Sequence, residues 1–417
     1  MCQLNSRPIQ VTLCLFPCGA TMPRNIVICC DGTTSQFAQA NTNVVKLYYM
    51  LDQNQHRQLT YYHPGLGTME PAGALTPWSR AITKVLGMAI GYGLSSDIRD
   101  VYSFLMENYQ QSDRLFFFGF SRGAYTVRAV CSLLHLYGLI RPGNEPLIPY
   151  AIRMMMGIDR ANHGIPGQQK QSEEYFTLAQ EFRRTMSGVD CKPYFVGVWD
   201  TVSSVGWIAN PLHLPFSSDN PDIEFGRHAV SIDECRAFFR DNLWRPSPHT
   251  KLHGPRDVKQ VWFPGVHCDV GGGYAEAESG ISKIALEWMV EEAEAKDLYI
   301  DGDRKKEVLG QIGDKYVRPN YDAEAHESLK GAWNLAEVVP KRRFNWDTQR
   351  WYYGANFWHR RTIPPHSLVH ESAYLRSGGY SNRLPADAIR VCTISAVELK
   401  VLDANRRVPA VPLPGAN

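Results

Sequence analysis

The chain has 417 residues, of which 44% are hydrophobic and 21% charged, and its formal net charge at pH 7 is +2. A chain of this length can bury a large core, either in two domains or in one large α/β domain with insertions. The near-neutral charge and the lack of a long apolar run exclude electrostatic capture of nucleic acid and stable insertion into a membrane as expected functions.

The ten cysteines include no C-x-x-C pair, which favours reduced thiols and a cytoplasmic location over a disulfide framework. Residues 10–20 resemble a short signal h-region, but only Arg7 precedes them as a charge, and Pro17 interrupts them. Met22 is a more natural start, since the first strand follows it directly. We therefore expect a disordered extension at residues 1–21 and a single domain over residues 22–417.

Strands and helices alternate along the chain, which predicts an α/β fold with a mostly parallel, doubly wound sheet. The predicted strands are short, apolar and followed by turn residues, and they span 25–30, 59–63, 115–120, 193–199, 259–264 and 390–394. Helical patterns cover 42–51, 78–109 in two pieces, 121–137, 173–186, 233–242 and 281–298. Residues 140–190 and 203–257 interrupt the alternation, and we expect them to form cap insertions.

The most informative stretch is Gly119-Phe-Ser-Arg-Gly123, which fits the pattern G-x-S-x-G. A buried strand precedes it and a helical pattern follows it, and this context is that of a nucleophile elbow. Such a turn exposes the hydroxyl of Ser121. Gly119 and Gly123 would be needed because side chains at these positions would collide with the neighbouring strand and helix. The alternative is a serine in an ordinary tight turn.

A serine nucleophile needs a base, and the base needs a carboxylate that fixes its tautomer. In doubly wound sheets such groups gather at the carboxyl ends of the strands. Asp200 follows the strand at 193–199 directly, and His267 follows the strand at 259–264. This order of Ser, Asp and His is the α/β-hydrolase order. Asp269 is the rival acid.

One irregularity concerns the positions of the acid and the base. Counted from the elbow strand, Asp200 follows the next predicted strand and His267 follows the one after that. Both positions are one strand earlier than in the commonest hydrolase layout. Either a strand is missing from the assignment, or the acid and base lie further inward in this sheet.

The tetrahedral intermediate of acyl transfer needs two backbone N–H donors, which form an oxyanion hole. Arg122, the residue after the nucleophile, would supply one of them. Gly32 or Thr33, in the turn after the first strand, would supply the other. The turn Gly65-Leu-Gly67 is the second choice for this role.

The first strand and its Asp31-Gly-Thr-Thr turn also suggest a phosphatase of the haloacid-dehalogenase type. That chemistry needs a nucleophilic Asp two residues before the unit, and Cys29 occupies this position. We therefore expect Asp31 to order the turn by hydrogen bonds to backbone N–H groups. Asp31 and Phe120 are also candidates for contact with the substrate. No His/Cys cluster has zinc spacing, and we expect no metal and no organic cofactor. A further alternative is a catalytically inactive binding or scaffold protein.

Several motifs in a fixed order carry a resemblance to a known family. They are Cys30-Asp-Gly-Thr33, Asn41-Thr-Asn-Val44, Tyr61-Tyr-His-Pro-Gly-Leu-Gly-Thr68, Gly119-Phe-Ser-Arg-Gly-Ala124, Gly197-Val-Trp-Asp-Thr-Val202, His228-Ala-Val-Ser-Ile-Asp233, Pro264-Gly-Val-His-Cys-Asp-Val-Gly-Gly-Gly-Tyr274, Val369-His-Glu-Ser372 and Tyr380-Ser-Asn-Arg-Leu-Pro385. The chain resembles the α/β-hydrolase-like family of formerly unknown function that includes the type VI secretion phospholipase effectors.

The resemblance implies a serine hydrolase with Ser121 as nucleophile, Asp200 as acid and His267 as base. The effector members cleave acyl esters of phospholipids. The expected function is therefore hydrolysis of a carboxylic acyl ester, with small-molecule and lipid esters both open as substrates and secretion as an effector open beside a cytoplasmic location. The sequence does not indicate an oligomeric state.

Overall fold

The computed structural model describes residues 23–32, 40–65, 90–161, 168–202, 206–207, 210–211, 214–236, 239, 242–245, 257–329, 337–338, 341–345 and 350–393. The extension expected at residues 1–21 lies outside these ranges, and so does the first of the two helical pieces expected over 78–109, up to residue 89.

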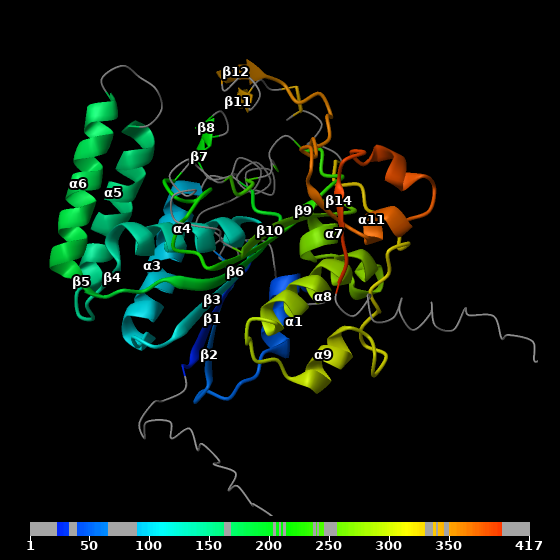
Figure 1. Cartoon of the computed structure of the whole chain (residues 1–417), viewed down its shortest axis with the longest axis horizontal. Coiled ribbons are helices and arrows are strands. Elements are labelled where there is room, and N and C mark those ends of the chain that lie inside the picture. Colours follow the sequence, from blue (N-terminus) through cyan, green and yellow to red (C-terminus); the bar gives the residue numbers. More distant parts are fainter. Residues whose placement is uncertain are drawn as a thin grey trace, which may run out of the picture.

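An eight-stranded sheet forms the centre of the molecule (Figure 1). From edge to edge its order is β2 (Gln58–His63), β1 (Asn25–Cys30), β3 (Arg114–Phe120), β6 (Pro193–Trp199), β9 (Phe225–Ser231), β10 (Asp257–Phe263), β13 (Leu368–His370) and β14 (Ile389–Val391). Its pairings are all parallel, which confirms the predicted fold class. The winding reverses between β1 and β3, and ligand sites of doubly wound sheets lie at such a switch point.

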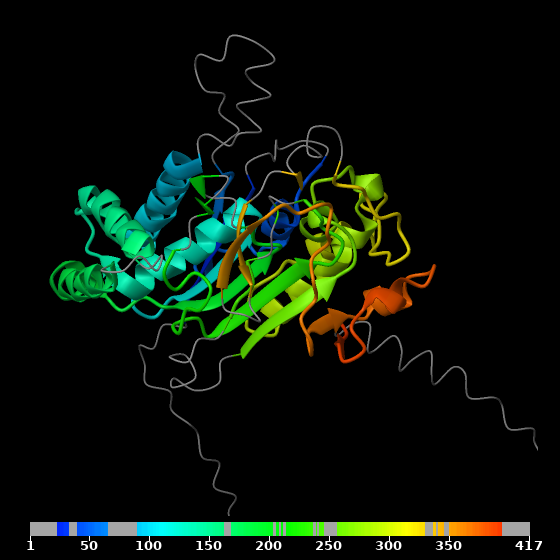
Figure 2. The ribbon, with the colours of Figure 1, turned by 90° about the horizontal axis from the view of Figure 1, so that it is seen from above.

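Helices cover both faces of the sheet, as Figures 1 and 2 show. One face carries α3 (Ile90–Asn108), α4 (Arg122–Tyr137), α5 (Ile148–Ala161) and α6 (Gln168–Met186). The other carries α1 (Asn43–Met50), α8 (Gly280–Glu294) and α9 (Gly302–Val308). Among the helices that the structure describes, none has the length and apolar character needed to cross a bilayer.

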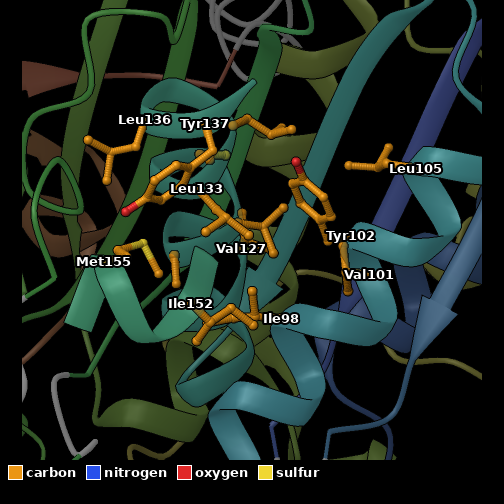
Figure 3. Packing of buried hydrophobic residues seen from close by; sticks show 14 of the residues in the cluster. Ile98, Val101, Tyr102, Leu105, Val127, Leu133, Leu136, Tyr137, Ile152 and Met155 are labelled. Carbon is orange, nitrogen blue, oxygen red and sulfur yellow. The ribbon is translucent and has the colours of Figure 1, made fainter. Parts of the chain in front are cut away.

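Because successive side chains of a strand point to opposite faces, each inner strand contributes side chains to the hydrophobic cores on both faces of the sheet. In β1, Ile26 and Ile28 join the core under α3 and α4, whereas Val27 and Cys29 join the core under α1 and α8. Figure 3 shows the first of these cores, in which apolar side chains of α3, α4 and α5 meet. Apolar residues at every position of an inner strand are thus expected for a sheet that is covered on both sides.

The remaining elements are short. They are β4 (Leu139–Ile140), β5 (Ser187–Val189), β7 (Gly206–Trp207), β8 (Asn210–Pro211), α7 (His267–Gly271), β11 (Lys341–Asn345), β12 (Arg350–Gly354) and α11 (Ser372–Leu375), with 3-10 turns at Glu145–Leu147, Glu276–Glu278 and Tyr380–Arg383.

The sequence analysis missed two strands of the sheet, β9 and β13, and two of the helices that cover it, α5 and α9. In β9, Arg227 and His228 interrupt the apolar run, yet both are buried. Arg227 is paired with Glu292 and Asp257 at 2.6 and 2.9 Å, so its charge is neutralised inside the protein. The helix expected over 233–242 was wrong for the residues described there, which are not helical.

The strand β9 changes the strand count between the elbow and His267. Three sheet strands, β6, β9 and β10, follow the elbow strand β3, and His267 comes after the third. Asp200 still follows the first of them. The missing strand β9 therefore explains the position of His267, whereas Asp200 does lie one strand further inward. β9 also lies inside the range 203–257, so that only the residues on either side of it are left for a cap.

Candidate active site

Ser121 lies in the turn between β3 and α4 with a left-handed backbone, at φ 58° and ψ −120°. A residue other than glycine in such a conformation stores strain of about 1–3 kcal/mol, and the surrounding structure has to hold it there. A Cβ atom on Gly119 would lie 2.7 Å from the backbone of Ala124, and one on Gly123 would lie 2.3 Å from the carbonyl oxygen of Cys30. The collisions expected for side chains at these two glycines are thus confirmed.

The structure brings Ser121, His267 and Asp200 together. His267 Nε2 lies 2.9 Å from Ser121 Oγ, and His267 Nδ1 lies 2.5 Å from Asp200 Oδ2. The histidine is the first residue of α7, in the segment that follows β10, and the aspartate is the residue after the end of β6. With Nδ1–H donating to the carboxylate, Nε2 is left as the acceptor for the serine hydroxyl. This is the arrangement of a nucleophile, a base and an orienting acid.

The ring of His267 contacts two aromatic side chains. The centroid of the Phe120 ring lies 4.6 Å from that of His267, and the Phe239 ring lies 4.7 Å away in an edge-on contact. Burial lowers the pKa of His267 below its ordinary value, although the Asp200 carboxylate acts in the opposite direction. The imidazole is therefore neutral at pH 7 and able to accept a proton.

Asp200 is buried and has a left-handed backbone with φ 39°. Its Oδ1 accepts a hydrogen bond from the Ser231 backbone N–H at 2.9 Å. Burial opposes ionisation, but the Arg361 guanidinium and the His267 ring outweigh it and hold the pKa of the Asp200 carboxyl well below its usual range. The sequence did not indicate a role for Arg361, because no motif in this loop distinguishes it from the adjacent Arg360.

The rival acid, Asp269, faces away from the ring of His267. Its Oδ1 lies 2.7 Å from His326 Nδ1, and its Oδ2 accepts a hydrogen bond from the Val266 N–H at 3.0 Å. A Cβ atom on Gly265 would lie 2.4 Å from Asp269 Cβ, which shows how tightly the loop packs around this residue. Asp269 therefore fastens the loop that carries His267.

The turn after β1 lies beside the elbow. A Cβ atom on Gly32 would lie 3.5 Å from Ser121 Cβ, yet the Gly32 N–H donates to Asp31 Oδ1 at 2.7 Å. Thr33 lies outside the described residues. Arg122 is the first residue of α4, so its N–H has no acceptor one turn earlier in the helix.

Asp31 is buried and orders this turn, since its Oδ2 accepts from Thr42 Oγ1 at 2.7 Å and from the Tyr62 hydroxyl at 2.9 Å. Phe120 is 5% exposed and packs against His267 and Gly271. Within the described ranges, no three His, Cys, Asp or Glu side chains are grouped so as to hold a metal ion. The described cysteines are free thiols.

Residues 24–292, which are more than half of the chain, match the family described as "T6SS, Phospholipase effector Tle1-like, catalytic domain". The chain belongs to this family. The resemblance carried by the ordered motifs is thereby confirmed at the level of the family.

Among curated proteins, the yeast protein "Uncharacterized protein YEL023C" of Saccharomyces cerevisiae is 32% identical over 234 residues, which are 54% of this chain and 33% of that protein. The chain therefore matches about a third of the length of this relative.

Two solved structures show weaker similarity. An uncharacterised protein from Pseudomonas aeruginosa has a TM-score of 0.38 at 20% identity and covers 68% of this chain and 47% of its own. The Tle1 effector, solved bound to the VgrG spike of the type 6 secretion system, has a TM-score of 0.30 at 16% identity, with 62% and 53% covered.

Proposed function

We propose that this protein is a serine hydrolase that cleaves carboxylic acyl esters of lipids. The observation that carries the proposal is the chain of contacts from Ser121 Oγ through both ring nitrogens of His267 to Asp200 Oδ2, at 2.9 and 2.5 Å. Membership of a family named for a phospholipase catalytic domain supports a lipid ester as the substrate.

In the proposed reaction, His267 Nε2 takes the hydroxyl proton as Ser121 Oγ attacks the acyl carbonyl. The tetrahedral intermediate collapses, the alcohol leaves with the proton from His267, and Ser121 is left acylated. A water molecule then gives a proton to His267 and attacks the acyl group. The second tetrahedral intermediate collapses as His267 returns this proton to Ser121 Oγ, which releases the carboxylic acid and restores the serine. Asp200 keeps Nδ1 protonated and stabilises the imidazolium that forms in each half of the reaction.

The negative oxygen of the intermediate would lie at the N-terminus of α4, where the Arg122 N–H is one donor and the helix dipole favours negative charge. The Gly32 N–H is engaged by Asp31 Oδ1 in this structure. For Gly32 to serve as the second donor, that hydrogen bond has to open when substrate binds. The roles of Thr33, of Asp31 and of Phe120 toward substrate stay predictions, as do the single domain with its caps and the cytoplasmic location.

A substrate panel tests the proposed function. The purified protein should hydrolyse nitrophenyl esters of increasing chain length and release fatty acid from phospholipid vesicles, with phospholipid favoured. Short esters alone would point to a soluble ester as the substrate. A lack of hydrolysis on the whole panel, together with a lack of labelling by a fluorophosphonate, would favour the inactive scaffold. Phosphate release that depends on magnesium and survives Ser121→Ala would overturn the proposal.

The acid can be assigned by comparing two aspartates. Asp200→Asn should lower kcat by about 10⁴-fold, because an amide at this position favours the wrong tautomer of His267. Asp269→Asn, which leaves the His267–Asp200 contact in place, should lower kcat by about tenfold or less. Steady-state kinetics on one nitrophenyl ester measures both. The reverse order of the two effects would transfer the role of acid to Asp269.

The pH dependence follows from the burial of His267. Only the neutral imidazole acts as a base, and its pKa is lowered from the ordinary value of 6.5. With an uncharged ester, kcat/KM should therefore stay constant through neutral pH and fall only below pH 6.5. A pH–rate profile checks this expectation, and an acid limb centred at or above pH 7 would contradict it.

A further inference from the structure

Arg361 reaches the acid of the site from a distant part of the chain. It lies in the loop between β12 and β13, 161 residues after Asp200, and its side chain is 5% exposed. Its Nη2 lies 3.1 Å from Asp200 Oδ2, and its Nη1 contacts Asp200 Oδ1. The two nitrogens thus meet the two carboxylate oxygens as a fork, which is the strongest arrangement available to this pair.

Further contacts fix the guanidinium itself. Nη1 donates to Ser231 Oγ at 2.8 Å, and Nε donates to the Phe239 carbonyl oxygen at 3.2 Å. Ser231 ends β9, and its N–H is also the backbone donor to Asp200 Oδ1. Phe239 packs on the ring of His267. Arg361 therefore contacts the acid and both segments that pack around the acid and the base.

The buried carboxylate needs this partner. A buried anion without a counter-charge is costly, and the neutral ring of His267 supplies none. The fork of Arg361 also restricts the rotation of the carboxylate, so that Oδ2 is kept toward His267 Nδ1. An oriented carboxylate is what an acid in this position contributes.

We propose that Arg361 is a positioning residue of the active site, which holds Asp200 ionised and aimed at His267. The proposal rests on the proposed function, because it assigns a role in the same reaction. Arg361 lies beyond residues 24–292, the part of the chain that matches the catalytic-domain family. The C-terminal third of the chain thus completes a site whose nucleophile, acid and base all lie before it.

The positive charge of Arg361 also acts on the base through Asp200. It offsets part of the carboxylate's negative charge and so disfavours the imidazolium form of His267. The other charged groups that act on this ring are Glu234, whose carboxylate accepts from the His267 backbone N–H at 3.2 Å, and Arg236, which is paired with Glu234 at 2.8 Å. Glu234 raises the pKa of His267 and Arg236 lowers it. Both stay in place when Arg361 is replaced, so the loss of Arg361 should leave His267 easier to protonate.

The test separates the charge of Arg361 from its geometry. The rate at which a fluorophosphonate labels Ser121 is measured from pH 5 to pH 9 for the wild type, Arg361→Gln and Arg361→Lys. In Arg361→Gln, the labelling rate on the pH plateau should fall by about 10–100-fold. Losses of this size follow when a group that orients a functional histidine through a hydrogen bond is removed. The acid limb of the profile should shift upward by about one pH unit. Arg361→Lys keeps the charge but not the fork, so its acid limb should stay near that of the wild type while its plateau rate falls.

Arg360→Gln is the matched control. Arg360 precedes Arg361 in the same loop, its side chain is 54% exposed, and it pairs with Asp233 at 2.7 Å. Its loss removes the same charge from the same loop, and the labelling profile should match the wild type. Urea unfolding of each variant identifies those that are not folded, and only folded protein is compared.

The outcomes distinguish the two proposals. A wild-type protein that is not labelled at Ser121 contradicts the proposed function itself. A labelled wild type whose acid limb and plateau are unchanged in folded Arg361→Gln overturns the role of Arg361 alone. A third outcome would also overturn the proposal. If the acid limb does not move in either Arg361 variant and the plateau rate falls only in proportion to the loss of stability, Arg361 has a purely structural role.

Discussion

Ser121→Ala is expected to lower kcat/KM for ester hydrolysis by about 10⁴-fold or more, because alanine has no oxygen that can attack the carbonyl. Losses of this size follow when a nucleophile that works as a unit with its base is removed. Initial rates on a nitrophenyl ester and on phospholipid vesicles measure the effect. Alanine fits the turn without new contacts, so the variant should fold as the wild type does.

Ser132→Ala provides the control for this variant. Ser132 lies on α4, the same helix that begins after Ser121, and its hydroxyl donates to the Arg128 carbonyl oxygen at 2.8 Å. Alanine favours a helix, and the variant should keep the wild-type rate within about threefold. If Ser121→Ala retained more than about a tenth of the wild-type activity, the nucleophile would lie elsewhere.

Gly123→Ala is expected to lower the free energy of unfolding by about 4 kcal/mol or more, or to leave the protein insoluble. The added Cβ would lie 2.3 Å from the Cys30 carbonyl oxygen and 2.6 Å from that of Asp31. Both atoms belong to the backbone at the end of β1, so α4 or β1 has to shift. Such a shift breaks packing at the centre of the sheet, where overpacking is not relieved by a side-chain rotation.

Urea unfolding followed by tryptophan fluorescence measures this effect. Gly302→Ala is the control, since a Cβ atom there meets no heavy atom within 4 Å and the residue is the first of α9. This control should be neutral or slightly stabilising. A Gly123→Ala protein within about 1 kcal/mol of the wild type would show that the elbow does not need the close approach of α4 to β1.

The sequence was most informative where one local pattern determines the structure. The apolar runs at 25–30 and 193–199 predict β1 and β6 with their observed bounds. The elbow could be predicted because strand, turn and helix are contiguous in the chain. The positions of Asp200 and His267 followed from the rule that the carboxyl ends of parallel strands meet at one edge.

The parts that could not be predicted depend on partners far away in the chain. Arg227 and His228 look unfit for a buried strand until Glu292 and Gln260 are seen beside them, at 2.6 and 3.2 Å. Arg361 looks like a surface arginine until its loop is placed against Asp200. The choice between Asp200 and Asp269 likewise depends on the direction of each side chain, which spacing along the chain does not determine.

The order of the strands has a consequence for the synthesis of the protein. From β3 to β14 the strands lie side by side in the same order in which they occur in the chain. As the chain emerges from the ribosome, each new strand of the sheet can therefore pair with the current edge strand, and no strands that are already paired have to separate. Ser121, Asp200 and His267 emerge with β3, β6 and β10, whereas Arg361 emerges last, just before β13. If Arg361 has the proposed positioning role, the site is complete only after this loop has been synthesised.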